Sequence, residues 1–155
     1  MFRKILVPTD YSKHSAEAVR YATDLARRYE AAITLVYVFE PVTYALPEGH
    51  LMQSPPQLQE MQAAFEQRLR DAAADAKAAG ARQVEAKVLT GPVAAEISDC
   101  AERGGFDLIV MGTHGRTGLR HLVLGSVAEK VVRTAPCAVL TVRYREPGQQ
   151  FPPQQ

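Results

Sequence analysis

Five short apolar runs, separated by amphipathic stretches of helical length, constrain the fold of this chain more than any other feature. The runs are rich in Val, Ile and Leu and lie at residues 4–7, 32–39, 84–89, 108–111 and 138–142. Strands separated by helices pair in parallel through right-handed crossovers. The sequence therefore predicts an α/β fold, with a parallel five-stranded sheet covered by helices on both faces.

The intervening stretches carry apolar residues at intervals of three and four, the pattern of helices with one buried face. The expected helices span residues 13–28, 57–79 and 92–103, and a fourth starts at residue 126. Ser12 is expected to cap the first helix. The apolar stripe of the second predicts core packing, with a coiled-coil partner as the alternative. Residues 41–56 are expected to form a long loop that is functional or mobile.

Composition excludes several classes of function. The 155 residues are 46% hydrophobic and 23% charged, with a formal net charge of +1, so neither nucleic acid nor a membrane surface is an expected partner. No apolar run reaches the roughly 20 residues that span a bilayer, and the N-terminal run is too short for a signal peptide. We therefore expect a cytoplasmic protein, with one domain over residues 1–144 and a disordered polar tail over residues 145–155.

The cysteines and histidines of the sequence do not form the pattern of a metal site. The two cysteines, Cys100 and Cys137, are expected to be small buried residues rather than a disulfide or redox pair. The four histidines lack the spacing of a zinc site.

Polar groups follow the first predicted strand, where open parallel sheets bind their ligands. Pro8 and Thr9 precede Asp10, whose carboxylate could accept hydrogen bonds from ribose hydroxyls or help to hold a divalent cation. The alternative role for Asp10 is to form the turn ahead of Ser12. At the end of the second strand, the main chain near Val38 could meet a flat base.

The connection between the fourth strand and the last helix, residues 112–126, has the composition of an anion site. It contains four glycines, two arginines and two histidines. Glycines let the backbone approach a ligand closely, and the start of a helix favours negative charge, so a phosphate-bearing ligand is one interpretation. An irregular loop with glycines at its turns is the other. The possible donors in this stretch are His114, Arg116, Arg120 and His121.

Ser126 has two possible roles at the start of the last helix. With Glu129 it forms the Ser-x-x-Glu pattern of a capping box, which predicts a helix cap. A phosphate contact would use the same helix end, so the two roles are compatible.

Gly112-x2-Gly115-x9-Gly125-Ser126 matches the G-2x-G-9x-G(S/T) signature of the universal stress protein family. Residues 5–12, 88–92, 108–116 and 136–142 also resemble segments of that family, and the resemblance covers residues 2 to about 143. It implies an adenine nucleotide alpha hydrolase-like sheet in the order 3-2-1-4-5. It also implies membership of the ATP-binding subgroup.

By this resemblance, the chain is a nucleotide-dependent stress-response regulator that binds ATP with Mg²⁺ or Mn²⁺. It would form a homodimer through residues 138–142, where an apolar edge strand gives an independent reason for pairing. By the resemblance Asp10 would help to hold adenosine, and its carboxylate is also our candidate ligand for the metal. The resemblance does not identify the protein partner. Together with Arg116 from the donors above, the implied nucleotide-binding residues are Pro8, Thr9, Asp10, Val38, Met111, Gly112, His114, Gly115, Gly125, Ser126 and Val127.

Motifs for other nucleotide chemistry are missing from the sequence. There is no GxxxxGK[ST] loop, no GxGxxG after the first strand, and only one acid, Asp10, where a phosphorylatable receiver domain needs several. We therefore expect a binding protein without dedicated catalysis. The alternatives are a slow Mg²⁺-dependent ATPase and an interaction scaffold with a structural nucleotide.

Overall fold

The computed structural model describes residues 2–40, 44–46, 49–51, 55–113 and 124–144. Its elements are β1 (Lys4–Pro8), α1 (Lys13–Tyr29), β2 (Ala32–Phe39), β3 (Tyr44–Leu46), β4 (Gly49–Leu51), α2 (Pro55–Ala78), β5 (Val84–Thr90), α3 (Val93–Gly104), β6 (Leu108–Gly112), α4 (Ser126–Thr134) and β7 (Ala138–Val142). No described helix is long and apolar enough to span a bilayer.

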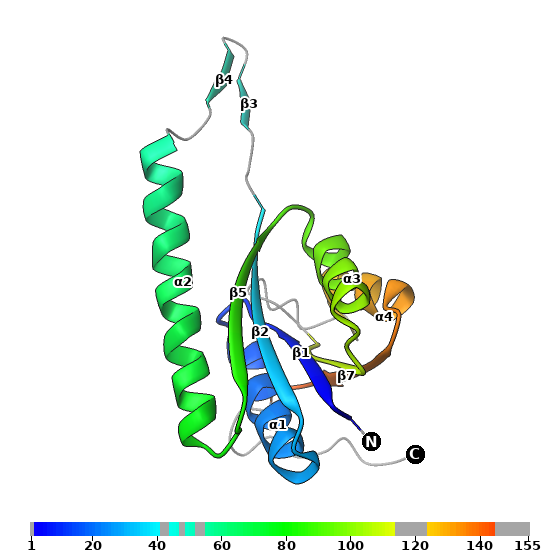
Figure 1. Cartoon of the computed structure of the whole chain (residues 1–155). Coiled ribbons are helices and arrows are strands. Elements are labelled where there is room, and N and C mark those ends of the chain that lie inside the picture. Colours follow the sequence, from blue (N-terminus) through cyan, green and yellow to red (C-terminus); the bar gives the residue numbers. More distant parts are fainter. Residues whose placement is uncertain (1, 41–43, 47–48, 52–54, 114–123, 145–155) are drawn as a thin grey trace.

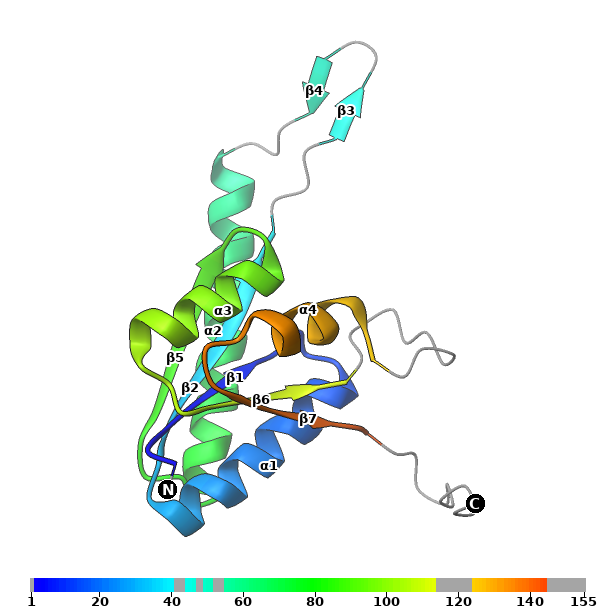
Figure 2. The same ribbon diagram turned by 90° about the vertical axis from the view of Figure 1, so that its right-hand side faces the viewer.

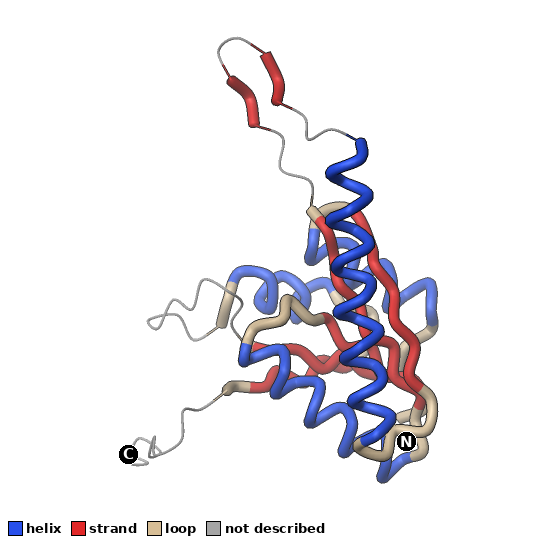
Figure 3. Tube along the Cα trace, turned by 90° about the vertical axis from the view of Figure 1, so that its left-hand side faces the viewer, coloured by secondary structure: helices blue, strands red, loops and turns tan. Residues whose placement is uncertain are grey.

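Five strands form one parallel sheet in the order β5-β2-β1-β6-β7. Numbered along the chain without β3 and β4, this order is 3-2-1-4-5, so the predicted fold class is confirmed. Figure 1 shows α2 on one side of the sheet and α3 with α4 on the other. The view in Figure 2 looks onto α3 and α4, and that in Figure 3 looks onto α1 and α2.

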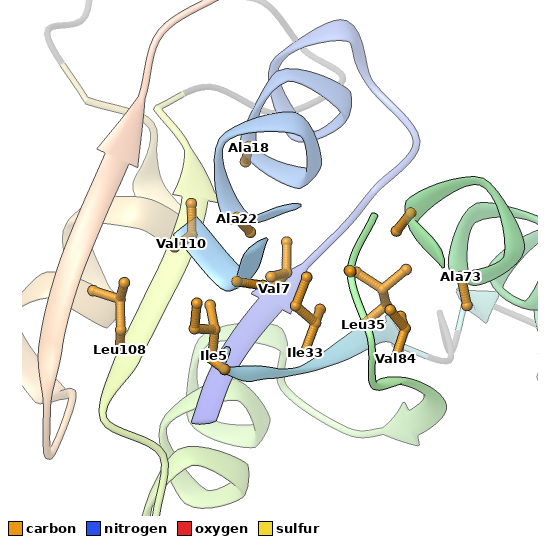
Figure 4. Packing of buried hydrophobic residues seen from close by; sticks show 14 of the residues in the cluster. Ile5, Val7, Ala18, Ala22, Ile33, Leu35, Ala73, Val84, Leu108 and Val110 are labelled. Atoms are coloured by element: carbon orange, nitrogen blue, oxygen red, sulfur yellow. The ribbon is translucent and has the colours of Figure 1, made fainter. Parts of the chain in front are cut away.

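Two apolar layers hold the helices to the sheet, because successive side chains of a strand point to opposite faces. In β1, Ile5 and Val7 join the layer beneath α1 and α2, whereas Leu6 joins the layer beneath α3 and α4. All three side chains are fully buried. Figure 4 shows the first layer, in which Ala18 of α1 and Ala73 of α2 bring both helices close to the strands.

The two cysteines, predicted to be buried, are only partly buried at the edge of the second layer. Cys100 and Cys137 are free, half-buried and packed against the apolar residues beneath α3 and α4. Burial raises the pKa of both thiols. A raised pKa keeps a thiol protonated at neutral pH, which makes it a poor nucleophile.

Residues 41–56 differ from the expected loop. They contain β3 and β4, two antiparallel strands of three residues each that form a sheet of their own. Three residues are too few to show the alternation by which a strand is predicted. The helix α2 begins at Pro55, two residues before the prediction, and the first turn is where a helix tolerates proline.

The N-terminal strand is held to the β6 side of the sheet by a carboxylate. Asp107 Oδ2 accepts hydrogen bonds from the N–H groups of Arg3 and Lys4 at 2.7 and 2.8 Å. These two backbone donors are the main reason that the pKa of Asp107 lies below its usual value. The ionised form therefore favours the folded state.

We expect the contribution of Asp107 to stability to depend on pH. Because its folded-state pKa is lowered, the contribution is complete above the unfolded-state pKa of about 3.9 and is lost as the pH falls through the folded value. Asp107→Ala should lower the unfolding free energy at neutral pH, and its difference from the wild type should shrink in acid. Urea titrations from neutral pH down to about pH 3 measure this difference. A difference that stays constant over that range would contradict the assignment; Asp99→Ala, at an exposed position of α3, is the control.

Candidate functional site

A cavity of about 530 Å³ opens where β1, β2 and β6 end and where α3 and α4 begin. Its size falls within the range of small-molecule sites. Its position beyond the carboxyl ends of the strands is where open α/β sheets bind ligands. The described residues that line it are Pro8, Thr9, Asp10, Ser15, Val36, Tyr37, Val38, Phe39, Glu40, Met61, Phe65, Val93, Ile97, Met111, Gly112, Thr113, Gly125, Ser126, Val127 and Ala128.

Every predicted site residue that the structure describes lines this cavity. These residues are Pro8, Thr9, Asp10, Val38, Met111, Gly112, Gly125, Ser126 and Val127. They come from four separate elements and are brought together by the parallel order of the sheet. The other predicted residues, His114, Gly115 and Arg116, lie outside the described residues, as do Arg120 and His121.

The cavity also has apolar walls from α2 and α3. Met61 and Phe65 belong to the apolar stripe of α2, which predicts core packing, and Val93 and Ile97 lie at apolar positions of α3. A helical stripe looks the same whether its residues meet the sheet or an opening beside it. Only the arrangement of α2 and α3 around the ends of the strands shows which of these residues face the sheet and which face the cavity.

The apolar wall on the α3 and α4 side is suited to a flat ring. Val38, Ile97 and Met111 line the cavity and belong to the layer beneath these helices. Ile97 is 1% exposed and Met111 is 5% exposed, so their positions are set by the core. A rigid apolar surface of this kind stabilises a planar group by removing both from water.

The N-cap residue of α4 differs from the one that the capping-box pattern predicts. Gly125, not Ser126, is the N-cap residue, and no side-chain hydrogen bond from the described residues caps this helix end. The N–H of Gly125 donates to the carbonyl oxygen of Thr113 at 2.7 Å, which joins the end of β6 to the start of α4. This long-range bond places the helix start one residue earlier than a capping box would. The predicted capping role of Ser126 is therefore wrong, and its exposed side chain lines the cavity instead.

Backbone donors are concentrated at this end of α4. The N–H groups of Ser126, Val127 and Ala128 occupy the first turn, where no earlier carbonyl of the helix is available to them. The intrahelical bonds begin with Glu129, whose N–H donates to the carbonyl oxygen of Gly125. The three residues that precede Glu129 line the cavity, so their donors and the helix dipole together favour an anionic ligand.

Asp10 forms a turn ahead of Ser12, the alternative role that the sequence predicts for it, and it also lines the cavity. Its Oδ1 atom accepts a hydrogen bond from the N–H of Ser12 at 3.0 Å. Ser12 caps α1, as predicted, by accepting from the N–H of Ser15. The hydroxyl of Thr9 donates to the Ser15 hydroxyl at 3.1 Å, so this edge of the cavity is preorganised by internal bonds.

The donor set around Asp10 suits a cation only in combination with ligand oxygens. Among the residues that the structure describes, no group of three His, Cys, Asp or Glu side chains could hold a metal ion. A carboxylate retains acceptor capacity after one hydrogen bond. Mg²⁺ is commonly held by one or two carboxylates together with phosphate oxygens and water. Asp10 fits that pattern.

Gly112 is required by packing against α1, whereas the sequence predicts glycines in this stretch for a close approach to a ligand. A Cβ atom at this position would lie 2.9 Å from both the carbonyl carbon and the Cβ atom of His14, in the first turn of α1. Its φ is outside the left-handed range, so an L-residue would be acceptable on conformational grounds alone. Glycine here lets α1 approach the end of β6.

Comparison with known proteins identifies relatives along almost the entire chain. The model of the universal stress protein family matches residues 1–143. A universal stress protein of Methanocaldococcus jannaschii is 35% identical over 144 residues, which cover 92% of this chain and 83% of that protein.

Solved structures agree with this relationship. The universal stress protein UspA from Lactobacillus plantarum has a TM-score of 0.79 at 28% identity, over 92% of this chain and 98% of that one. A universal stress protein in complex with cAMP has a TM-score of 0.69 at 27% identity, over 92% of this chain and 97% of that one. The chain therefore belongs to the universal stress protein family.

Proposed function

We propose that this protein is a cytoplasmic regulator that binds ATP in the cavity at the ends of β1, β2 and β6. The observation that carries the proposal is the convergence on one cavity of an apolar wall, a carboxylate and the first turn of α4. Adenine would lie against the apolar wall, and the phosphates would accept hydrogen bonds from the first turn of α4. The relative in complex with cAMP supports an adenine nucleotide as the ligand class.

Asp10 would serve the ribose hydroxyls or a Mg²⁺ or Mn²⁺ ion bound to the phosphates. Such an ion would offset the negative charge that the phosphates bring close to the Asp10 carboxylate. Asp10 already accepts one backbone hydrogen bond, which fixes the orientation of its carboxylate before a ligand arrives. A preorganised ligand group loses little conformational entropy on binding.

Nucleotide binding without dedicated catalysis is the function that we favour. The acidic residues among the described cavity residues are Asp10 and Glu40. Hydrolysis needs a group that orients water and positive charge that stabilises the transition state. Rapid multiple-turnover phosphate release that Asp10→Ala abolishes would replace this proposal with an ATPase.

We expect freshly purified protein to release ATP when it is denatured, and mass spectrometry of the released nucleotide tests this. Calorimetry of protein stripped of nucleotide should then show binding of ATP in the presence of Mg²⁺. If ATP gave no heat while cAMP or AMP bound, the ligand would be reassigned within the same site. If no adenine nucleotide bound, the proposal would be wrong, and so would the two alternatives, a slow ATPase and an interaction scaffold with a structural nucleotide.

We further propose that the regulator acts as a homodimer paired through β7, whose nucleotide-bound state is read by a protein partner. The strand β7 is an edge of the sheet, and its Leu140 side chain is 37% exposed. An apolar edge strand is a template for pairing with a second chain. Sedimentation should show a dimer at micromolar concentration, and Leu140→Lys should shift it toward monomer. A wild-type monomer at that concentration would contradict this pairing.

A further inference from the structure

Tyr11, the residue after Asp10, has a backbone conformation that is unusual for its type. Its φ is 63°, in the left-handed region that L-residues with a side chain seldom adopt. The other described non-glycine residue in this region is Glu30, the C-cap of α1, where helices commonly end in this conformation. Tyr11 instead precedes α1. Strain of this kind persists where surrounding contacts offset it, and it is concentrated at functional sites.

Contacts with β2 and α2 hold the Tyr11 side chain in place. Its hydroxyl donates to the carbonyl oxygen of Phe65 in α2 at 2.9 Å. Its ring stacks on that of Tyr37 with a centroid distance of 5.2 Å, and the Arg68 guanidinium carbon lies 4.0 Å from the ring centroid. Burial is the main reason that the pKa of Tyr11 rises to about 12, so the hydroxyl keeps its proton at neutral pH.

The backbone of Tyr11 belongs to the turn that presents Asp10. Its N–H donates to Thr9 Oγ1 at 3.1 Å, and the N–H of Ser12 donates to Asp10 Oδ1 at 3.0 Å. The same short segment therefore bonds to α2 through the Tyr11 side chain and lines the cavity through Thr9 and Asp10. Phe65, which accepts the Tyr11 hydrogen bond, also lines the cavity.

We infer that Tyr11 is a positioning residue of the nucleotide site, because it fastens the turn at residues 9–12 to α2 and so sets the position of the Asp10 carboxylate. This inference rests on the function proposed above. It has a mechanical consequence: α2 and the turn move together, so a ligand that contacts Asp10 also restrains α2 near Phe65.

A double-mutant cycle on ATP binding in the presence of Mg²⁺ tests whether Tyr11 acts through Asp10. Tyr11→Phe removes only the hydroxyl, and Asp10→Asn retains the acceptor of the turn while removing the charge. We expect Tyr11→Phe to weaken ATP binding about three- to tenfold, the range produced by one lost hydrogen bond. In the Asp10→Asn background it should cause little further loss, whereas with Ser126→Ala the two effects should multiply.

The outcomes separate this inference from the proposed function. If the wild type binds ATP and Tyr11→Phe matches it, or if the losses from Tyr11→Phe and Asp10→Asn multiply independently, the positioning role is wrong and nucleotide binding stands. If the wild type binds no adenine nucleotide, the proposed function fails and this inference fails with it. Tyr29→Phe, at an exposed tyrosine of α1, should leave the affinity unchanged. Thermal unfolding of each variant verifies that it is folded.

Hydrogen exchange tests the coupling to α2 independently. ATP with Mg²⁺ should slow amide exchange in the turn of α2 around Phe65 in the wild type, and the effect should be lost in Tyr11→Phe. Equal slowing in both proteins would show that the Tyr11 hydroxyl does not transmit the restraint. Slowing in neither would show that α2 is not coupled to the site.

Discussion

Replacing Ser126 with aspartate will reduce ATP affinity at least about 100-fold without destabilising the protein. The new carboxylate would lie at the first turn of α4, beside the donors that we propose for the phosphates. Two like unit charges about 4 Å apart near a protein surface repel by about 4 kcal/mol, and about 1.4 kcal/mol is a tenfold change in affinity. Negative charge at a helix N-terminus instead stabilises the helix, by about 0.3–1 kcal/mol.

The opposite signs of the two effects make this variant informative, and Ala95→Asp is its matched control. Ala95 is exposed in the first turn of α3 and is not among the described residues of the cavity. The control should show normal ATP affinity, and its unfolding free energy should change by less than about 1 kcal/mol, because the gain at the helix N-terminus is offset by repulsion from Asp99 one turn later. Calorimetry and urea titration give the two quantities. Unchanged ATP binding by Ser126→Asp would remove the α4 N-terminus from the proposed site.

Replacing Gly112 with valine will lower the unfolding free energy by about 3 kcal/mol or more, the upper range for overpacked sites. The obstacle is the main chain of His14 at 2.9 Å, which has no rotamer by which to move away. The first turn of α1 would have to shift from the end of β6, and Asp10 would shift with it because it joins β1 to this helix. The mutation should therefore also weaken nucleotide binding.

Gly105→Ala separates crowding from backbone strain. A Cβ atom at Gly105 would meet nothing within 4 Å, but the φ of this residue is +60°. Its substitution should cost only the strain of a left-handed alanine, about 1–2 kcal/mol. Denaturant titration compares the two variants. A Gly112→Val protein no less stable than Gly105→Ala would show that α1 is free to adjust.

The periodicity of the sequence was sufficient for the parallel α/β architecture, because strand and helix repeats are local properties of the chain, whereas the strand order was expected from the family resemblance. The strand β2 spans Ala32–Phe39, as its β-branched and aromatic run predicts, and Ser12 caps α1, as its position before the helix predicts. The family relationship expected from the glycine motif is also confirmed. The short strands β3 and β4 were missed because they are too brief to have a detectable period.

The candidate site was only partly predictable, because several of its features arise from contacts between distant segments. The capping box at Ser126 failed because the bond from Gly125 to Thr113 decides where α4 begins. Phe65 lines the cavity and also stacks on Tyr37 of β2 with a ring-centroid distance of 4.2 Å, and no pattern within α2 reveals that one residue does both. The roles of the predicted residues in binding a nucleotide remain predictions, including those of His114, Gly115 and Arg116.

The sequence by itself determined the parallel α/β architecture and, through the resemblance, the family and part of the set of residues that meet at the carboxyl edge of the sheet. The architecture follows from apolar periodicity, and the resemblance rests on a glycine spacing and on several short segments, all of which are properties of the sequence alone. Only the tertiary structure decided why Gly112 must be glycine and how Tyr11 joins the Asp10 turn to α2. Such roles depend on atoms contributed by segments far apart in sequence, whose approach is set by the packing of the whole domain.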